Sequence, residues 1–293
     1  EKYPDHVENF GNLFIDEINN PEVIFSEKYD YEAGKSHQWD ALAQPAGFGF
    51  NWSSNYPVYL ETLEQFDFID GSSGLVDRDM YDDNTPIDPN WYFGMRDPRM
   101  KASIFYPGSS FKNGTVFFHR SMTGNLEGWP RSGLSKLTGS MATGLLIRKR
   151  TNPDTPDATR SSTDYIIFRL GEILLNYVEA AYYLGDPNGD MVSLINQIRD
   201  RAGMPSLSLG EITEEKIRQE RRCELAFEEH VFWDLRRWRI AVQELDNKRR
   251  HRLHYRFNAN TETYTIEIAD GDLGGVRLHP ERNYYYALGL NRL

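Results

Sequence analysis

The stretch TEEKIRQERRCELAFEEHVFWDLRRW (213–238) is the most informative part of the chain. Its spacing predicts one continuous helix that begins at Thr213. Counted at 100° per residue, three large apolar residues share one stripe of this helix: Phe227, Val231 and Trp238. Glu220 falls on the same stripe, and Glu224 lies near its edge. Carboxylates beside large apolar groups either pair with cations or take part in chemistry, so this stretch raises the main functional question.

Two interpretations of this acid pair are open. Glu220 and Glu224 stand at i, i+4, which places their Cβ atoms about 6 Å apart, near the carboxylate spacing of about 5 Å in a retaining glycoside hydrolase. Hydrolase acids, however, must flank an open sugar cleft, and these two lie among apolar residues. We therefore expect an internal ion-pair network. Its candidate cations are on the preceding helix or further along the same one: Arg199, Arg201, Arg236 and Arg237.

The residues before this stretch predict a pair of helices. The first carries one apolar stripe, with Asp164 as its expected start and Gly185 as its end; the stripe is Ile167, Leu170, Leu174, Val178 and Ala181. The second carries Val192, Ile195, Ile198 and Ala202 and stops before Pro205. The short connection Asp186–Asp190 makes the two antiparallel, as in the unit of helical-repeat folds.

The chain changes character near residue 160. Residues 1–160 read as a loop-rich lobe, and residues 161–293 as a helical region, which we expect to form one structural unit with the lobe. In the lobe, helices are predicted at Tyr3–Ile18 and Val58–Phe66, and short strands at Val23–Tyr29, Ala102–Tyr106, Val116–His119 and Leu145–Arg148. Two more strands are predicted near the end of the chain, at Tyr264–Ile268 and Asn283–Ala287. The fold class predicted is mainly α, with tetratricopeptide-like helix pairs packed against a loop-rich lobe that has a few short β-strands.

Composition limits the possible partners. A formal net charge of −11 argues against nucleic acid, which needs clustered cations. No apolar run is long enough to span a bilayer, and the first residues, EKYPDHVENF, do not have the pattern of a signal peptide. A single cysteine, Cys223, excludes an internal disulfide.

Several spaced motifs resemble the C-terminal half of the SusD/RagB family of outer-membrane nutrient-binding lipoproteins. They occur in the family's order: PEVIFSEKYD (21–30), YLETLEQFDFIDGSS (59–73), MRDPRMKASIFYPG (95–108), FRLGEILLNYVEAAYYLGDPNG (168–189), LINQIRDRAGMP (194–205) and ITEEKIRQERRCELAFEEHVFWDLRRW (212–238). Family members are longer, with an N-terminal helical half that follows a signal peptide and a lipid-bearing cysteine. We expect this chain to lack that half, the signal and the anchor.

The resemblance implies non-catalytic capture of an oligosaccharide at the cell surface. The full-length protein would be lipid-anchored in the outer membrane and would deliver its ligand to a SusC-like TonB-dependent transporter. Some relatives are expected to bind peptides, so a peptide- or protein-binding scaffold is the main alternative. A glycoside hydrolase that uses Glu220 and Glu224 is a further alternative.

Aromatic residues in polar, turn-prone loops are the candidate ligand platform. Sugars present flat C–H faces edged by hydroxyls, which suits rigid rings with polar groups nearby. The candidates are Trp39 in HQWD, Trp52 and Tyr56 in NWSSNY, and Trp91 and Tyr92 in PNWYF. Any one of them could instead fill the core beneath its own loop.

Neither a cofactor nor a resident metal is expected. The turn Asp186-Pro-Asn-Gly-Asp190 imitates the first positions of a calcium loop, but its glycine is misplaced and no glutamate stands at the twelfth position. We interpret it as an inter-helix turn. The cluster Arg96-Asp97-Pro98-Arg99 is likewise interpreted as a structural turn.

Overall fold

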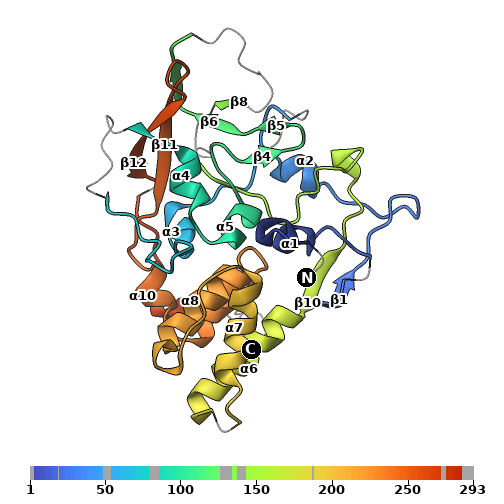
Figure 1. Ribbon diagram of the computed structural model, residues 1–293, viewed down its shortest axis with the longest axis vertical. Helices are drawn as coiled ribbons and strands as arrows, with labels where there is room; N and C mark the ends of the chain where they lie inside the picture. The colour runs from blue at the N-terminus through green and yellow to red at the C-terminus, as the bar shows by residue number, and fades with distance from the viewer. Residues whose placement is uncertain are drawn as a thin grey trace, which may run out of the picture.

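The computed structural model describes residues 3–18, 20–48, 54–78, 86–125, 134–136, 143–186, 188–271 and 275–285. Strands and short helices occupy the upper part of Figure 1, and the longest helices form the lower part. The helices are α1 (His6–Asn12), α2 (Trp39–Ala43), α3 (Leu60–Leu63), α4 (Pro89–Gly94), α5 (Pro98–Ser103), α6 (Leu170–Leu184), α7 (Met191–Arg201), α8 (Glu214–Glu224), α9 (His230–Arg237) and α10 (Ala241–Leu245). The strands are β1 (Val23–Glu27), β2 (Pro86–Ile87), β3 (Ile104–Phe105), β4 (Ser110–Phe111), β5 (Gly114–Thr115), β6 (Phe117–His119), β7 (Ser121–Thr123), β8 (Leu134–Lys136), β9 (Leu146–Ile147), β10 (Tyr165–Arg169), β11 (His251–Asn258) and β12 (Thr263–Asp270).

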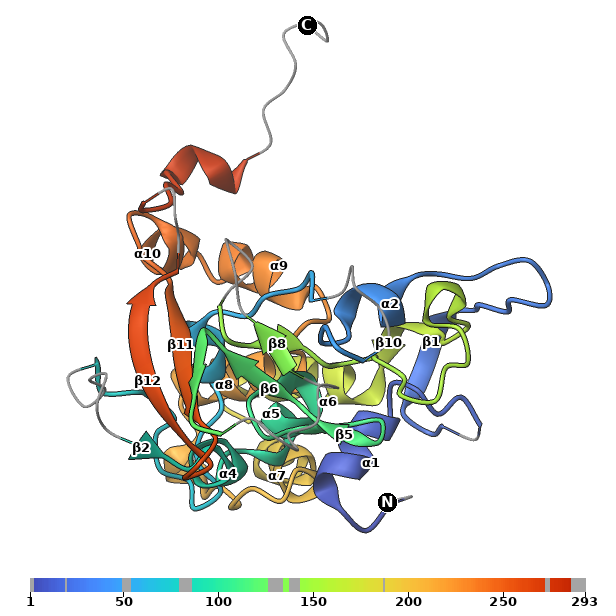
Figure 2. The same ribbon diagram turned by 90° about the horizontal axis from the view of Figure 1, so that it is seen from above.

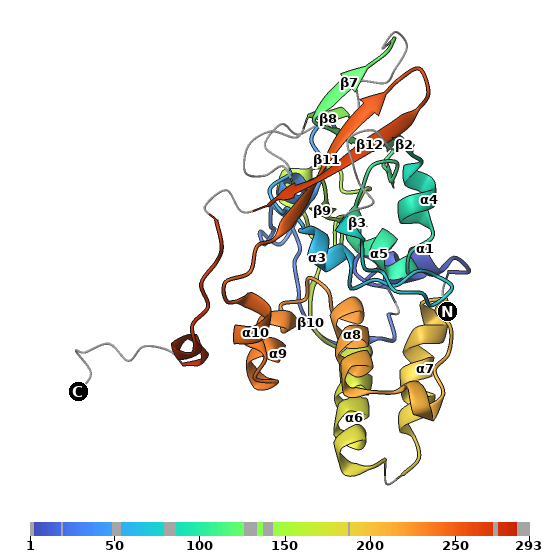
Figure 3. The same cartoon turned by 90° about the vertical axis from the view of Figure 1, so that its left-hand side faces the viewer.

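The predicted helical hairpin is confirmed as α6 and α7, which lie side by side with α8 in the lower part of the molecule (Figure 3). Val178, Ile195 and Ile217, one from each of these helices, are buried in a shared apolar cluster. The opposite side of α6 remains exposed although it is also apolar, at Leu170, Ile173, Tyr177 and Leu184. None of the helices in the described part of the chain combines the length and apolarity needed to cross a bilayer.

Gly185 ends α6 in the left-handed conformation, with φ of 75°. We expect Gly185→Ala to lower the free energy of unfolding by about 1 kcal/mol, because a Cβ is strained at positive φ. Gly210→Ala is the matched control: both sites have open space around a built Cβ, but only Gly185 has positive φ. Urea unfolding of both variants checks this. Equal stability of the two would contradict the assignment of strain to φ.

The predicted helix start at Asp164 is wrong. Residues Tyr165–Arg169 form β10, which pairs antiparallel with β1. Two adjacent isoleucines in this segment suit a strand, because β-branched side chains favour extended backbone. Asp164 instead pairs with Lys28 and accepts a hydrogen bond from the Tyr29 N–H at 3.1 Å, so it fixes a loop rather than a helix end.

The single helix predicted from residue 213 to 238 is also wrong. Thr213 caps the start as expected, since its side chain accepts a hydrogen bond from the Lys216 N–H at 3.2 Å. The helix stops at Glu224, however, and α9 begins only at His230. Phe227 and Glu229 in the connection are left-handed, with φ of 63° and 69°. The break gives α9 a direction of its own, so the stripe counted on one straight helix does not exist.

The largest sheet is built mainly from the end of the chain and has the order β2-β12-β11-β7. β11 and β12 form a long antiparallel hairpin that pairs without a register shift, visible at the top of Figure 3. The strand predicted at Tyr264–Ile268 is therefore confirmed within β12, whereas its partner β11 was not predicted. The strand predicted at Asn283–Ala287 is wrong over its described part, since residues 281–284 form a short 3₁₀ helix.

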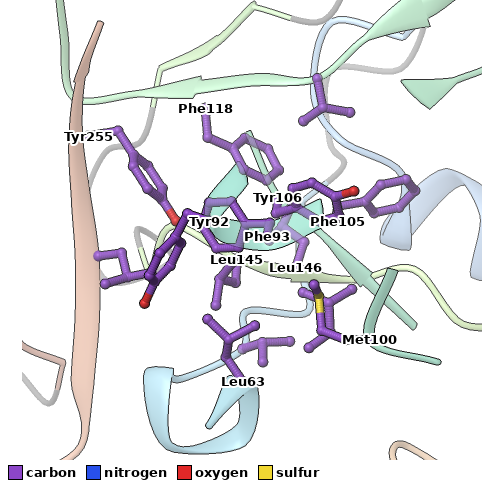
Figure 4. Close-up of a cluster of buried hydrophobic side chains, with 14 of the residues drawn as sticks. Leu63, Tyr92, Phe93, Met100, Phe105, Tyr106, Phe118, Leu145, Leu146 and Tyr255 are labelled. Carbon is purple, nitrogen blue, oxygen red and sulfur yellow. The ribbon is translucent and has the colours of Figure 1, made fainter. Parts of the chain in front are cut away.

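The main core lies between this hairpin and the short helices and strands of the first half (Figure 4). Its fully buried members include Phe93, Phe105, Phe118, Leu145 and Tyr255. They come from both sides of residue 160. Segments of the loop-rich region and of the region after residue 160 therefore share one apolar core.

Candidate functional site

Trp39 and Tyr56 form a stacked pair at the surface. Trp39 opens α2, where its indole Nε1 donates to the Lys149 carbonyl at 3.2 Å. Its ring lies on that of Tyr56, with centroids 4.6 Å apart and planes inclined by 23°. Both side chains are half-buried. Such offset stacking holds the two rings rigidly while leaving part of their surface accessible.

A guanidinium extends this stack. The Cζ atom of Arg150 lies 4.6 Å from the Trp39 ring centre and 4.5 Å from that of Tyr165, so the cation is held between two aromatic rings. Trp39 is thereby contacted by both Tyr56 and Arg150.

The stack lines one side of a cavity of about 840 Å³. Helix α9 and the residues just before it, including Phe227, Phe232 and Trp233, line the same cavity. Figure 2 shows α2 and α9 on the same side of the molecule. A cavity of this size is within the usual range of small-ligand sites, about 300–1,000 Å³.

Backbone strain gathers around this cavity. Arg150, Phe227 and Glu229 all line it, and all three have positive φ, at 67°, 63° and 69°. Each such residue costs on the order of 1 kcal/mol and persists only where surrounding structure holds it. Two of these residues, Phe227 and Glu229, stand in the connection between α8 and α9.

Carboxylates in the cavity wall are mostly paired within the protein. Glu61 lies 2.5 Å from the Nδ1 atom of His251, and Glu64 accepts from Arg78 at 2.9 Å. Glu244 lies 3.3 Å from Arg222. Because these charges are already satisfied, the wall offers aromatic surface and paired polar groups rather than a strongly charged field.

Glu220 and Glu224 are not part of the cavity. Their exposed fractions are 2% and 0%, and both belong to a buried ion-pair network that joins α8 to other segments. Its main contacts are Glu220 with Arg99 and Arg199, at 2.5 and 2.7 Å, and Glu224 with Arg99, Arg169 and Arg201, the first two at 3.1 and 2.6 Å. The structure leaves a sugar no access to this acid pair, so the hydrolase mechanism based on it is wrong.

The predicted partners of the acids are partly correct. Arg199 and Arg201 contact them, whereas Arg236 donates to the carbonyls of residues 283 and 284, and Arg237 pairs with Glu179 and Asp234. Two partners from far away in the sequence, Arg99 and Arg169, were not predicted. Asp97 caps α5 and binds Arg99 at 2.7 Å, which confirms the structural interpretation of the 96–99 cluster.

The network controls the ionisation of its members. Burial disfavours the charged form of Glu224, but the attraction of Arg201, Arg169 and Arg99 outweighs it and holds the pKa of Glu224 well below its usual value. Burial is outweighed in the same way at Glu228, whose pKa falls to about 2 beside Arg169 and Lys149. These carboxylates are therefore ionised structural groups and not proton donors for chemistry near neutral pH.

Comparison with known proteins places this fold in a family. The model of the SusD family matches residues 21–274. The chain belongs to the SusD family. It is 36% identical over 92 residues to SusD-like protein P38 of Formosa agariphila, an alignment that covers 28% of this chain and 18% of that protein.

Solved SusD-like structures agree over most of the chain. A SusD-like protein of Bacteroides fragilis superposes with a TM-score of 0.70 at 25% identity, over 95% of this chain and 53% of that one. A SusD-like carbohydrate-binding protein of the same organism superposes with a TM-score of 0.61 at 25% identity, over 79% of this chain and 44% of that one. This chain thus spans about half the length of these solved SusD-like proteins.

The aromatic residues predicted as ligand contacts lie in different places in this SusD family member. Trp39 and Tyr56 come together in the cavity wall. Trp91 is 65% exposed on α4 but does not line the cavity. Tyr92 is corrected, since it is 3% exposed and packs in the core against Phe93, away from a surface ligand. Trp52 lies outside the described residues.

The aromatic residues of α9 were missed. The helical count placed Val231 on an inward stripe, yet it is 39% exposed, as are its neighbours Phe232 and Trp233, at 46% and 54%. The sequence did contain one signal for their exposure. In Phe232-Trp233-Asp234 two large rings precede an acid, and in this SusD-family chain the acid is buried in an ion pair with Arg221, while the rings stay exposed. A straight-helix count could not use this signal without knowing where the helix breaks.

Proposed function

We propose that this chain binds an oligosaccharide, without cleaving it, in the cavity walled by Trp39 and Tyr56. The observation that carries the proposal is a rigid aromatic stack at the edge of a cavity whose carboxylates are largely paired internally. Aromatic rings contribute to sugar binding through their flat faces, and a ring held in place loses little entropy when a ligand arrives.

Family membership supports the same function. SusD-like proteins include one described as carbohydrate-binding, which shares this fold. In the full-length protein we propose that the ligand is captured at the outer surface of the outer membrane and passed to a SusC-like TonB-dependent transporter. The residues for ligand contact in this proposal are Tyr56 and Trp39, with Trp52 and Trp91 as secondary candidates.

Removal of the stack tests the proposal. We expect Tyr56→Ala and Trp39→Ala each to weaken binding of a retained polysaccharide about 5- to 30-fold, the loss of about one to two kcal/mol expected of an aromatic contact. The measurement is affinity electrophoresis against a panel of neutral and acidic polysaccharides, followed by calorimetry with the bound one. Tyr56→Phe is the matched control, because it keeps the ring and should keep most of the affinity.

Three outcomes would oppose the proposal. If no polysaccharide of the panel retains the chain, the proposal that this chain binds a glycan is wrong. Unchanged affinity in both alanine variants would remove the site. Binding of peptides in place of glycans would favour the peptide-binding alternative, and release of reducing sugar would favour a hydrolase.

A further inference from the structure

Helix α9 exposes large apolar side chains and buries a charged one, which is the reverse of a helix that only supports the fold. Its buried positions are Asp234 and Leu235, whereas Val231, Phe232 and Trp233 are exposed. Apolar side chains normally face the core, and an exposed group of large ones marks a surface that binds something. The exposed rings of α9 line the same cavity as Trp39 and Tyr56.

The buried carboxylate of Asp234 attaches α9 to the rest of the fold even though the aromatic side chains of the helix are exposed. Asp234 accepts from Arg221 of α8 at 2.7 Å and from Arg237 at 2.8 Å. The bond to Arg221 joins α9 to α8 through charge, whereas the bond to Arg237 lies within α9. The aromatic residues of α9 are therefore not needed to attach the helix.

The exposed rings are nevertheless held in fixed positions. Phe232 and Trp233 pack edge to face, with centroids 5.0 Å apart and planes at 82°. The guanidinium of Arg236 covers Phe232 at 5.0 Å and also donates to the Asn283 carbonyl at 2.6 Å. Rings that are both exposed and immobile lose little further entropy on contact with a ligand.

We infer that Trp233, supported by Phe232, is a second sugar-stacking wall of the cavity, separate from the wall formed by Trp39 and Tyr56. This inference rests on the proposed function and specifies its ligand. The occupant is an oligosaccharide long enough for separate sugar rings to contact both walls. A monosaccharide reaches one wall only.

Chain length of the ligand provides the test. The probes are oligosaccharides of increasing length, prepared from the polysaccharide that the wild-type chain retains. For wild type, affinity should rise with length until both walls are occupied. In Trp233→Ala the longest oligomers should bind at least about tenfold more weakly, while the shortest bind as to wild type. Trp233→Phe should recover most of the loss.

Phe25→Ala is the matched control, because Phe25 is also a well-exposed aromatic residue, at 56%, but does not line the cavity. It should bind every oligomer as wild type does. Circular dichroism and the unfolding midpoint verify that all variants are folded, which the 54% exposure of Trp233 favours.

The outcomes separate this inference from the proposed function. If Trp39→Ala loses affinity and Trp233→Ala matches wild type at every length, the second wall is wrong and the first stands. If Trp233→Ala weakens short and long oligomers equally, Trp233 belongs to one shared subsite and the two-wall inference is again wrong. If wild type binds no oligosaccharide, the proposed function itself fails.

Discussion

Replacing Glu224 by alanine should lower the free energy of unfolding by about 3–5 kcal/mol, the range for removing one partner of a buried ion pair. Glu224 is completely buried and contacts Arg99, Arg169 and Arg201. Without its carboxylate these three cations face one another with less compensation in a site that excludes water. Repulsion among them adds to the cost of their desolvation.

Urea unfolding monitored by circular dichroism measures this effect. Glu215→Ala is the control, since Glu215 is an exposed acid on the same helix and its loss should cost less than about 1 kcal/mol. Similar midpoints for the two variants would show that the network does not hold α8 in place. A stable Glu224→Ala protein with altered glycan binding would move this residue back among the functional candidates.

Acid should unfold the protein through Glu228. Its pKa is about 2 in the folded chain against an ordinary 4.5, with burial opposing the shift and Arg169 and Lys149 producing it. A lowered carboxyl pKa stabilises the folded state fully above pH 4.5, and this stability is lost as the pH falls toward 2. At 1.36 kcal/mol for each pKa unit, the contribution of this one group is about 3 kcal/mol.

The test is the free energy of unfolding between pH 6 and pH 2.5 for wild type and Glu228→Gln. Below pH 4.5 the wild-type curve should fall more steeply than the variant's, because only wild type has this carboxylate to protonate on unfolding. Lys149 stays protonated in both states over this range, so it does not contribute to the slope. Parallel curves would contradict the role assigned to Glu228.

The sequence alone was sufficient where structure depends on local periodicity. The spacing that ends at Gly185 and before Pro205 predicted the helix pair α6 and α7, because amphipathic helices repeat their apolar positions. The predicted α6 stripe is correct at Val178 and Ala181, whereas Ile167 and Leu170 are exposed, at 37% and 40%. The same reasoning gave Glu220 and Glu224 a structural role, since burying an acid requires a cation. The motifs 21–238 were likewise enough to indicate the SusD family, which the family match confirms.

Tertiary structure decided which groups meet. Arg99 and Arg169 reach α8 from 125 and 55 residues away from Glu224, and no spacing rule links such positions. Helix α8 ends at Glu224, and Arg169 pairs with both Glu224 and Glu228, on either side of the start of the connection to α9.

The candidate site was likewise predicted in part from the sequence and determined in part by tertiary structure. Loop composition predicted that Trp39 and Tyr56 contact a ligand, but it predicted the same for Tyr92, which is buried in the core. The choice between a ring that fills the interior and a ring that faces a ligand depends on what packs against it from elsewhere in the chain. Residue types could therefore predict that this protein has aromatic surfaces to offer. Only the folded arrangement determined that Trp233 lines the same cavity as Trp39, because contacts between residues distant in the sequence bring these segments together.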